Sequence, residues 1–200
     1  ILAIDDGSDD GSYEELKRMK KFFSSLKVIK FVQNTGQSAA FLAGFKYAQG
    51  RLVVTMDGDL QNDPQDIPKL LNYINLFDVV IGWRYNRRDT LWKKIQSKIA
   101  NQIRHMVLKD SIKDIGCGLK IFKREQLDNI LPFKGLHRFY PIILEAEGYS
   151  VKQVKVNHRP RFKGKTKYGM LNRAFRAYKD MLAVKWMVKR AIHYQVEEVI

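Results

Sequence analysis

Two carboxylates separated by one residue, Asp57 and Asp59, follow an apolar run at residues 53–56. The β-branched run is typical of a buried strand, so both acids lie where that strand ends. Desolvating two neighbouring carboxylates is costly, and a divalent cation removes that cost. With Gln61 they place three oxygen donors within five residues, which suits Mg²⁺ or Mn²⁺. The alternative is a solvated acidic turn, because so short a motif is common by chance.

A second acidic loop, at residues 5–12, follows an apolar run at residues 1–4. In α/β folds, ligands lie at the carboxyl ends of strands, so a strand that leads into such a loop is a ligand-binding arrangement. Asp5 and Asp6 begin this loop. Carboxylates in this position accept hydrogen bonds from base N–H or ribose hydroxyl groups. We therefore predict that Asp5 and Asp6 bind part of a nucleotide.

Three further loops have the composition of phosphate sites. Asn34 and Gly36 lie in a turn before a helix, whose N-terminal N–H groups favour phosphate, although an ordinary strand–helix turn fits equally well. Arg84 begins a basic loop, and an Arg fork binds phosphate bidentately; a solvated loop is the alternative. Five of the eleven residues at 159–169 are Lys or Arg, which favours a clamp on a diphosphate or a polyanion.

The hydrophobic periodicity predicts the elements that must position these side chains. Strands are expected at 1–4, 28–32, 51–56 and 77–82, with helices at 13–25, 39–48 and 65–74 between them. This alternation predicts an α/β fold, with a mostly parallel sheet and helices on both faces. The remaining helices are expected at 91–108, 124–130, 136–147 and 170–194, and the remaining strands at 119–122 and 151–158.

Charge is unevenly distributed along the 200 residues, which carry a net charge of +15. Residues 1–80 have a net charge of −2 and residues 81–200 one of +17. A strongly basic half seeks phosphate on nucleic acid, lipid head groups or small anions. The single Cys117 excludes an internal disulfide and a cysteine-built zinc site. No apolar run reaches the roughly 18 residues of a membrane-spanning helix.

Two expected helices combine an apolar stripe with cationic residues. In 170–194 the stripe ends at Trp186 among clustered cations, which favours a basic amphipathic helix at a membrane interface over a helix packed only on the core. For 91–108, covering the sheet and resting on a membrane are equally consistent with the pattern. We expect one domain over residues 1–169 and a C-terminal amphipathic segment over residues 170–200.

The motifs, in this order, resemble those of family 2 glycosyltransferases of the dolichyl-phosphate mannose synthase group, which includes bacterial polyprenyl-phosphate sugar transferases. The resemblance covers nearly the whole chain and rests on residues 5–12, 34–40, 57–64, 82–84, 114–119 and 161–169. It implies a GT-A (Rossmann-like) fold. It also implies metal-dependent, inverting transfer of a sugar from GDP-mannose or a UDP-hexose to a polyprenyl or dolichyl phosphate. The location implied is the cytoplasmic face of a membrane, peripheral or anchored by parts outside this segment.

The resemblance further implies roles for individual residues. Asp6 would contact the nucleotide base, and Asp57 the ribose or the metal. Asp59 and Gln61 would hold Mg²⁺ or Mn²⁺ on the donor diphosphate. The residues expected to hold donor or acceptor phosphates are Arg84, Arg161 and Lys167. Because the acceptor is already an anion, the reaction demands no strong general base and depends on cations at the leaving diphosphate.

The sequence also departs from the family. The family's first strand, which ends in a Pro-x-Tyr-Asn-Glu-like segment and belongs in the centre of the sheet, is absent from these residues. The chain begins within an expected strand and without Met, so we interpret it as part of a longer protein. Gly58 stands where the family often has Ala, which we expect to be tolerated. The Gln-x-x-Arg-Trp signature of processive polysaccharide synthases is absent, which argues against cellulose- or hyaluronan-type synthesis.

Three other functions are compatible with the sequence. A soluble GT-A transferase acting on a glycan or a protein is one, although the cationic C-terminal segment argues against it. A nucleic-acid-binding module is another, but the acidic loops of the first half would repel a nucleic-acid backbone, so we expect no nucleic-acid partner. The third is a non-catalytic nucleotide-binding module.

Overall fold

The computed structural model describes residues 1–85, 91–127, 131–160 and 170–192. The elements follow one another in the order β1 (Leu2–Asp5), α1 (Ser12–Lys20), β2 (Lys27–Lys30), α2 (Gln37–Tyr47), β3 (Leu52–Thr55), η1 (Pro64–Asp66), α3 (Ile67–Leu71), β4 (Val79–Arg84), α4 (Leu91–Leu108), β5 (Lys120–Lys123), η2 (Arg124–Leu127), α5 (Leu136–Ala146), β6 (Val151–Val156) and α6 (Met170–Arg190).

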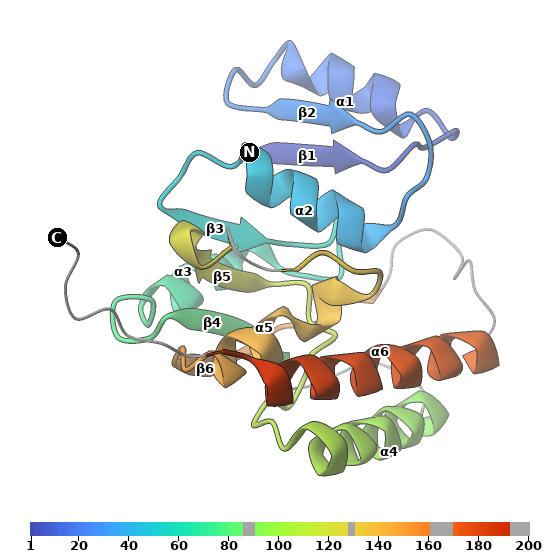
Figure 1. Cartoon of the computed structure of the whole chain (residues 1–200). Coiled ribbons are helices and arrows are strands. Elements are labelled where there is room, and N and C mark those ends of the chain that lie inside the picture. Colours follow the sequence, from blue (N-terminus) through green and yellow to red (C-terminus); the bar gives the residue numbers. More distant parts are fainter. Residues whose placement is uncertain (86–90, 128–130, 161–169, 193–200) are drawn as a thin grey trace, which may run out of the picture.

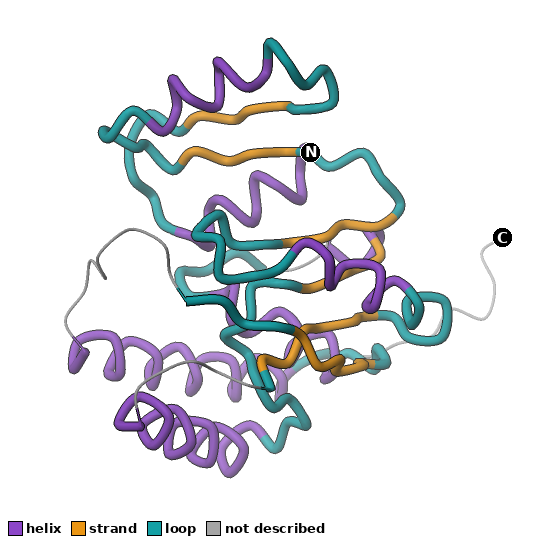
Figure 2. Tube along the Cα trace, turned by 180° about the vertical axis from the view of Figure 1, so that it is seen from behind, coloured by secondary structure: helices purple, strands orange, loops and turns teal. Residues whose placement is uncertain are grey.

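The strands form two sheets (Figures 1 and 2). β1 and β2 make a parallel pair, and the larger sheet has the order β3-β5-β4-β6. β4 and β6 are parallel, whereas β5 runs antiparallel to both β3 and β4. β3, β4 and β6 therefore run in the same direction, as a mostly parallel sheet requires. The antiparallel β5 was not predicted. The chain reaches β5 from the edge at which β4 ends, so β5 must run back across the sheet.

Helices cover both faces of the larger sheet. On one face α2, α5 and α6 share a core cluster in which Phe45 contacts Tyr140 edge to face, with ring centroids 5.0 Å apart. On the other face α3 contributes Leu70, which packs with Val80 and Ile121. The alternation of apolar residues along β4 and β5 supplies both clusters, because successive side chains point to opposite faces of a sheet.

The helix predicted at 65–74 is shorter in the structure. A 3₁₀ turn, η1, begins it, where the Asp63 side chain accepts a hydrogen bond from Gln65 N at 3.1 Å. α3 then ends at Leu71. The helix predicted at 124–130 is the 3₁₀ helix η2 over the residues that the structure describes, and 128–130 lie outside them.

This topology brings several polar segments to one edge of the sheet. β3 ends just before Asp57, β4 ends at Arg84, and β6 ends just before Asn157. Because β5 is antiparallel, it starts at this same edge with Lys120. The edge thus combines acidic and basic groups from loops that are far apart in the sequence.

Candidate active site

The Asp57 carboxylate lies just after the end of β3, between Gln37 and Gly118. Gln37, the first residue of α2, donates a hydrogen bond from Nε2 to Asp57 Oδ1 at 2.8 Å. On the other side of the carboxylate, a Cβ atom added to Gly118 would lie only 2.5 Å from Asp57 Oδ2. The Thr55 hydroxyl donates to the Gly118 carbonyl at 2.9 Å. The bare backbone of Gly118 therefore makes the space that Asp57 occupies.

Opposing effects act on the pKa of Asp57. Burial raises the pKa of Asp57, and the nearby Asp59 carboxylate raises it further. Lys120, Arg84 and the hydrogen bond from Gln37 lower it. Because burial dominates, the ionised carboxylate is held at a cost, which a cation placed between Asp57 and Asp59 would remove.

Lys120 supplies a buried positive charge beneath this edge. It is only 3% exposed and lies opposite Thr55 on β3 and Ile81 on β4. Burial lowers the pKa of Lys120, while the acids Asp57 and Asp114 favour its charged form. The sequence pattern does not single out Lys120 as a site residue, although a lysine inside an otherwise apolar strand is an unusual feature that could have indicated it.

Arg84 forms a bidentate ion pair with Asp114. Its Nε and Nη2 atoms donate to Asp114 Oδ2 and Oδ1 at 2.7 and 2.8 Å. Both side chains are largely buried, at 15% and 9% exposure. The guanidinium fork that we expected on a phosphate is therefore engaged by Asp114, and Arg84 acts on the edge through its charge beside Asp57.

Asp59 and Gln61 lie in the loop that follows Asp57. The Gln61 N–H donates to Asp59 Oδ1 at 3.1 Å, which connects two of the three predicted metal ligands. Among the described residues, no three His, Cys, Asp or Glu side chains gather as a metal site. The candidate set consists of two carboxylates and one amide. Such a set fits Mg²⁺ or Mn²⁺, which prefer oxygen ligands and complete their coordination with water and substrate phosphates.

The residues predicted to bind a nucleotide form a neighbouring group. Asp6 accepts hydrogen bonds from the backbone N–H of Thr35 at 2.7 Å and of Gly36 at 2.8 Å, and from Asn34 Nδ2 at 3.0 Å. The N–H groups of the turn before α2, where we expected a phosphate, are thus hydrogen-bonded to the carboxylate of Asp6. Gln37 follows directly in α2 and contacts Asp57, so the two groups are connected.

Asp5 is 4% exposed at the end of β1. Its Oδ1 atom accepts a hydrogen bond from Ser8 N at 2.8 Å. Its Oδ2 atom is buried and has no hydrogen-bond partner within the part of the chain that the structure describes. A buried carboxylate oxygen without a partner is costly, so this atom is a candidate acceptor for a ligand N–H or hydroxyl group.

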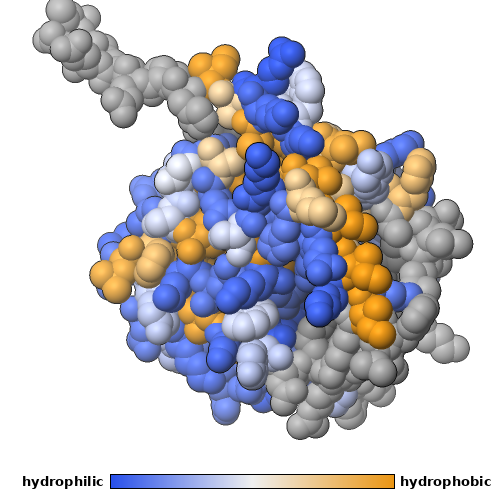
Figure 3. All heavy atoms as spheres, turned by 90° about the horizontal axis from the view of Figure 1, so that it is seen from below, coloured by the Kyte–Doolittle hydropathy of each residue, from blue (hydrophilic) through white to orange (hydrophobic). Residues whose placement is uncertain are grey.

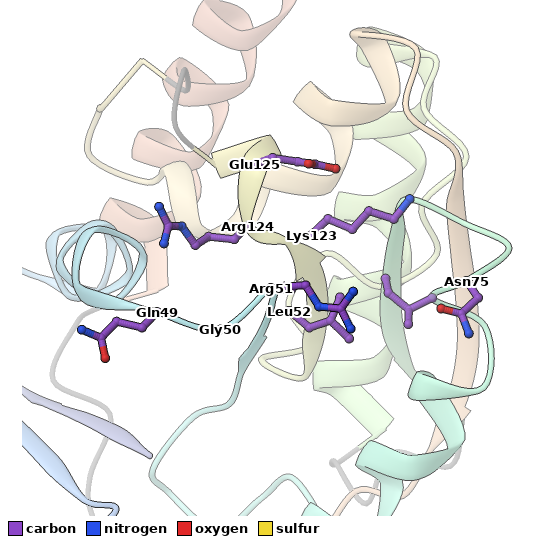
Figure 4. A pocket seen from close by; sticks show the side chains of 9 residues that line it. Gln49, Gly50, Arg51, Leu52, Asn75, Lys123, Arg124 and Glu125 are labelled. Atoms are coloured by element: carbon purple, nitrogen blue, oxygen red, sulfur yellow. The ribbon is translucent and has the colours of Figure 1, made fainter.

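The structure thus gathers eight predicted site residues at one edge, in two connected groups: Asp5, Asp6, Asn34 and Gly36 in one, and Asp57, Asp59, Gln61 and Arg84 in the other. Arg161 and Lys167 lie outside the described residues. A cavity of about 510 Å³ lies elsewhere, at the opposite end of β3 (Figure 4). Arg51, Lys123 and Arg124 are among its lining residues, and none of the predicted site residues lines it.

Comparison with known proteins identifies the family to which the chain belongs. The sequence model described as Glycosyl transferase family 2 matches residues 1–131. A dodecaprenyl-phosphate galacturonate synthase from Rhizobium johnstonii is 35% identical over 198 residues, covering 94% of this chain and 57% of that protein. An undecaprenyl-phosphate 4-deoxy-4-formamido-L-arabinose transferase from Aeromonas hydrophila is 35% identical over 174 residues, covering 86% of this chain and 53% of that protein. The chain spans about half the length of these relatives.

Solved structures share the fold at lower identity. Glucosyl-3-phosphoglycerate synthase from Mycobacterium tuberculosis, in complex with Mg²⁺ and uridine diphosphate, has a TM-score of 0.67 and 16% identity over 94% of this chain and 67% of that one. The same enzyme with Mn²⁺, UDP-glucose and phosphoglyceric acid has a TM-score of 0.64 at 16% identity, with coverage of 94% and 67%. These similarities confirm the predicted GT-A fold.

The contact between Gly118 and Asp57 predicts different effects for two glycine substitutions. Gly118→Ala places a methyl group against the Asp57 carboxylate, and we expect it to lower the free energy of unfolding by about 1–3 kcal/mol. Gly58→Ala meets nothing within 4 Å, and we expect a change within about 0.5 kcal/mol. Urea unfolding of both variants measures the difference. Equal stability of the two variants would contradict the geometry described for Gly118.

Proposed function

Because the chain belongs to glycosyl transferase family 2, we propose that it transfers a sugar, with inversion, from a nucleoside diphosphate sugar to a polyprenyl phosphate. The observation that carries the proposal is the partly buried Asp57 carboxylate, which lies against Gly118 and interacts with the charge of Lys120, with two further oxygen-bearing side chains in the next loop. Two relatives at 35% identity are named for transfer to dodecaprenyl and undecaprenyl phosphate, which supports this class of acceptor.

The donor nucleotide would bind along the group at the end of β1. Asp5 Oδ2 is buried and needs a donor, so a base N–H or a ribose hydroxyl group would satisfy it. Asp6 connects the loop of residues 5–8 to the loop of residues 33–36 through hydrogen bonds. It would thereby fix the two loops against which the nucleotide would lie. Gly7 permits this contact, because a Cβ there would lie 2.5 Å from Gln33 C and its φ is +67°.

The donor diphosphate would lie beside Asp57, Asp59 and Gln61, which would hold Mg²⁺ or Mn²⁺. When bound, the cation would neutralise the charge that develops on the leaving nucleoside diphosphate. The positive charges of Arg84 and Lys120 favour the ionised form of Asp57, and the hydrogen bond from Gln37 orients its carboxylate. The acceptor phosphate would attack the anomeric carbon directly, because it is already ionised. In this proposal Arg161 and Lys167 hold donor or acceptor phosphates.

Donor binding can be tested through thermal stability. A ligand that binds only the folded state raises the free energy of unfolding, by about 2.7 kcal/mol at a concentration 100 times its Kd. The melting temperature rises as a result. We expect UDP or GDP to raise the melting temperature with Mn²⁺ and not with EDTA. Asp59→Ala should abolish the metal-dependent shift, whereas Glu14→Ala, an exposed acid on α1, should retain it. Absence of a shift with both nucleotides would refute the proposed site.

A second part of the proposal concerns the membrane. Within the described residues, no helix is long and apolar enough to span a bilayer. α4 and α6 contact each other, and both expose apolar side chains: Ile95, Ile99, Ile103 and Met106 on α4, and Phe175, Tyr178, Leu182 and Trp186 on α6. Figure 3 shows apolar and hydrophilic side chains next to one another on this side of the molecule. We propose that this face, defined by those eight residues, rests on an anionic membrane surface, such as the cytoplasmic leaflet.

α6 packs on the core and also exposes aromatic and cationic side chains. Met181 and Val184 are buried, at 4% and 0% exposure, and attach the helix to the core. Asp180 adds an ion pair with Arg138 of α5 at 2.9 Å. On the exposed side, Lys179 lies 4.6 Å from the centroid of the Phe175 ring, so a cation accompanies an exposed aromatic side chain. This is the combination expected of an interfacial helix that is fixed to a globular domain.

Vesicle binding tests the membrane surface. We expect the double variant Phe175→Ala, Trp186→Ala to bind vesicles that contain anionic lipid about thirtyfold more weakly, because partial burial of each aromatic side chain contributes on the order of 1 kcal/mol. Phe22→Ala removes an exposed aromatic side chain (71% exposed) that lies outside this face, and it should leave binding unchanged. Co-sedimentation at low and high salt gives both comparisons. Equal binding by the wild type and the double variant would contradict the proposal.

A further inference from the structure

The segment that follows β6 is attached to the loop that carries the predicted metal ligands. Asn157 donates from its backbone N to Asp66 Oδ2 at 2.7 Å and from Nδ2 to Asp66 Oδ1 at 3.2 Å. Arg159 donates from its backbone N to the Gln61 carbonyl at 3.0 Å and from Nη2 to Asp63 Oδ2 at 2.5 Å. Asp66 is fully buried. Residues 157–159 are therefore held against residues 61–66 on both sides of His158.

His158 lies between these attachments and contacts the side chain of Gln61. It is 9% exposed, and its Nε2 atom is 3.4 Å from Gln61 Nε2. An amide nitrogen only donates hydrogen bonds, so His158 Nε2 accepts this contact in the tautomer that carries the ring proton on Nδ1. With its nitrogen directed to His158, the amide of Gln61 leaves Oε1 as the atom available to a cation.

We propose that His158 is a positioning residue for the metal: it fixes the orientation of the Gln61 amide so that Oε1, and not the NH₂ group, faces the cation held by Asp57 and Asp59. The inference rests on the proposed function. Without this contact the amide would rotate freely and would present a donor to the cation in part of its orientations. Outer-shell partners of this kind typically contribute about 10–100-fold to metal affinity.

Within the part of the chain that the structure describes, the other hydrogen bonds of Gln61 are made by its backbone. Its N–H donates to Asp59 Oδ1, and its carbonyl accepts from Arg159 N. These bonds fix the main chain but not the amide, which has its own rotatable bonds. Because His158 is buried and its neighbours Asn157 and Arg159 are hydrogen-bonded to the same loop, the imidazole is fixed where the amide needs an acceptor.

The experiment compares two substitutions that differ by one methylene group. The side chain of His158→Gln reaches the position of the imidazole Nε2 and offers an acceptor there, whereas that of His158→Asn reaches only the position of Nδ1. The Mn²⁺ concentration that gives half of the metal-dependent thermal shift is measured for the full chain at a fixed UDP or GDP concentration. We expect it to rise about tenfold in the Asn variant and less than about threefold in the Gln variant. The melting temperature without ligand should be similar for both.

Two further variants separate the possible explanations. In a Gln61→Ala background, His158→Asn should have no further effect, because its action passes through the amide; a full effect there would show that His158 acts independently and would overturn the inference. His105→Leu, a histidine on α4, is the control and should bind Mn²⁺ like the wild type. Equal Mn²⁺ dependence of the wild type and the Asn variant would also overturn the inference. A wild type without any Mn²⁺-dependent shift would overturn the proposed function and this inference together.

Discussion

The cost of partly burying the Asp57 carboxylate is the constraint on which the rest of this edge depends. Burial raises its pKa, and the neighbouring Asp59 adds to the effect. Gly118 makes the space, Gln37 donates the hydrogen bond, and the buried Lys120 supplies the opposite charge. Removing one partner of such a group leaves an uncompensated charge in a low-dielectric site. A cation would offset the cost of holding Asp57 ionised beside Asp59. Such a cation would in turn bind the donor diphosphate, so the cost at Asp57 favours binding of a metal–diphosphate complex.

Several acids of the chain hold loops in place before a ligand binds. Asp6 satisfies the N-terminus of α2, and Asp66 holds the segment that follows β6. Asp114 likewise holds Arg84 in a bidentate pair. Each contact joins segments that are distant in the sequence and adjacent at one edge of the sheet. A site whose supporting loops are already fixed spends less conformational entropy when the substrate binds.

The local part of this site could be predicted from the sequence, and the non-local part could not. The positions of Asp57 and Asp59 follow from an apolar run that ends in an acidic turn, which is a pattern of neighbouring residues. Lys120 and His158 reach the site only because β5 is inserted in reverse between β3 and β4 and because β6 ends beside the acidic loop. Strand order and direction depend on long-range packing that periodicity does not encode. For the same reason the Asp114 partner of Arg84 could not be anticipated.

The central claim is that Asp57, Asp59 and Gln61 hold a divalent cation together with a nucleoside diphosphate. Anomalous diffraction from a crystal grown with Mn²⁺ and the nucleotide that stabilises the chain tests it most directly. We expect one manganese peak within coordination distance of Asp57, Asp59 and Gln61, next to the bound diphosphate. A nucleotide bound with manganese elsewhere, or a manganese peak remote from this loop, would contradict it.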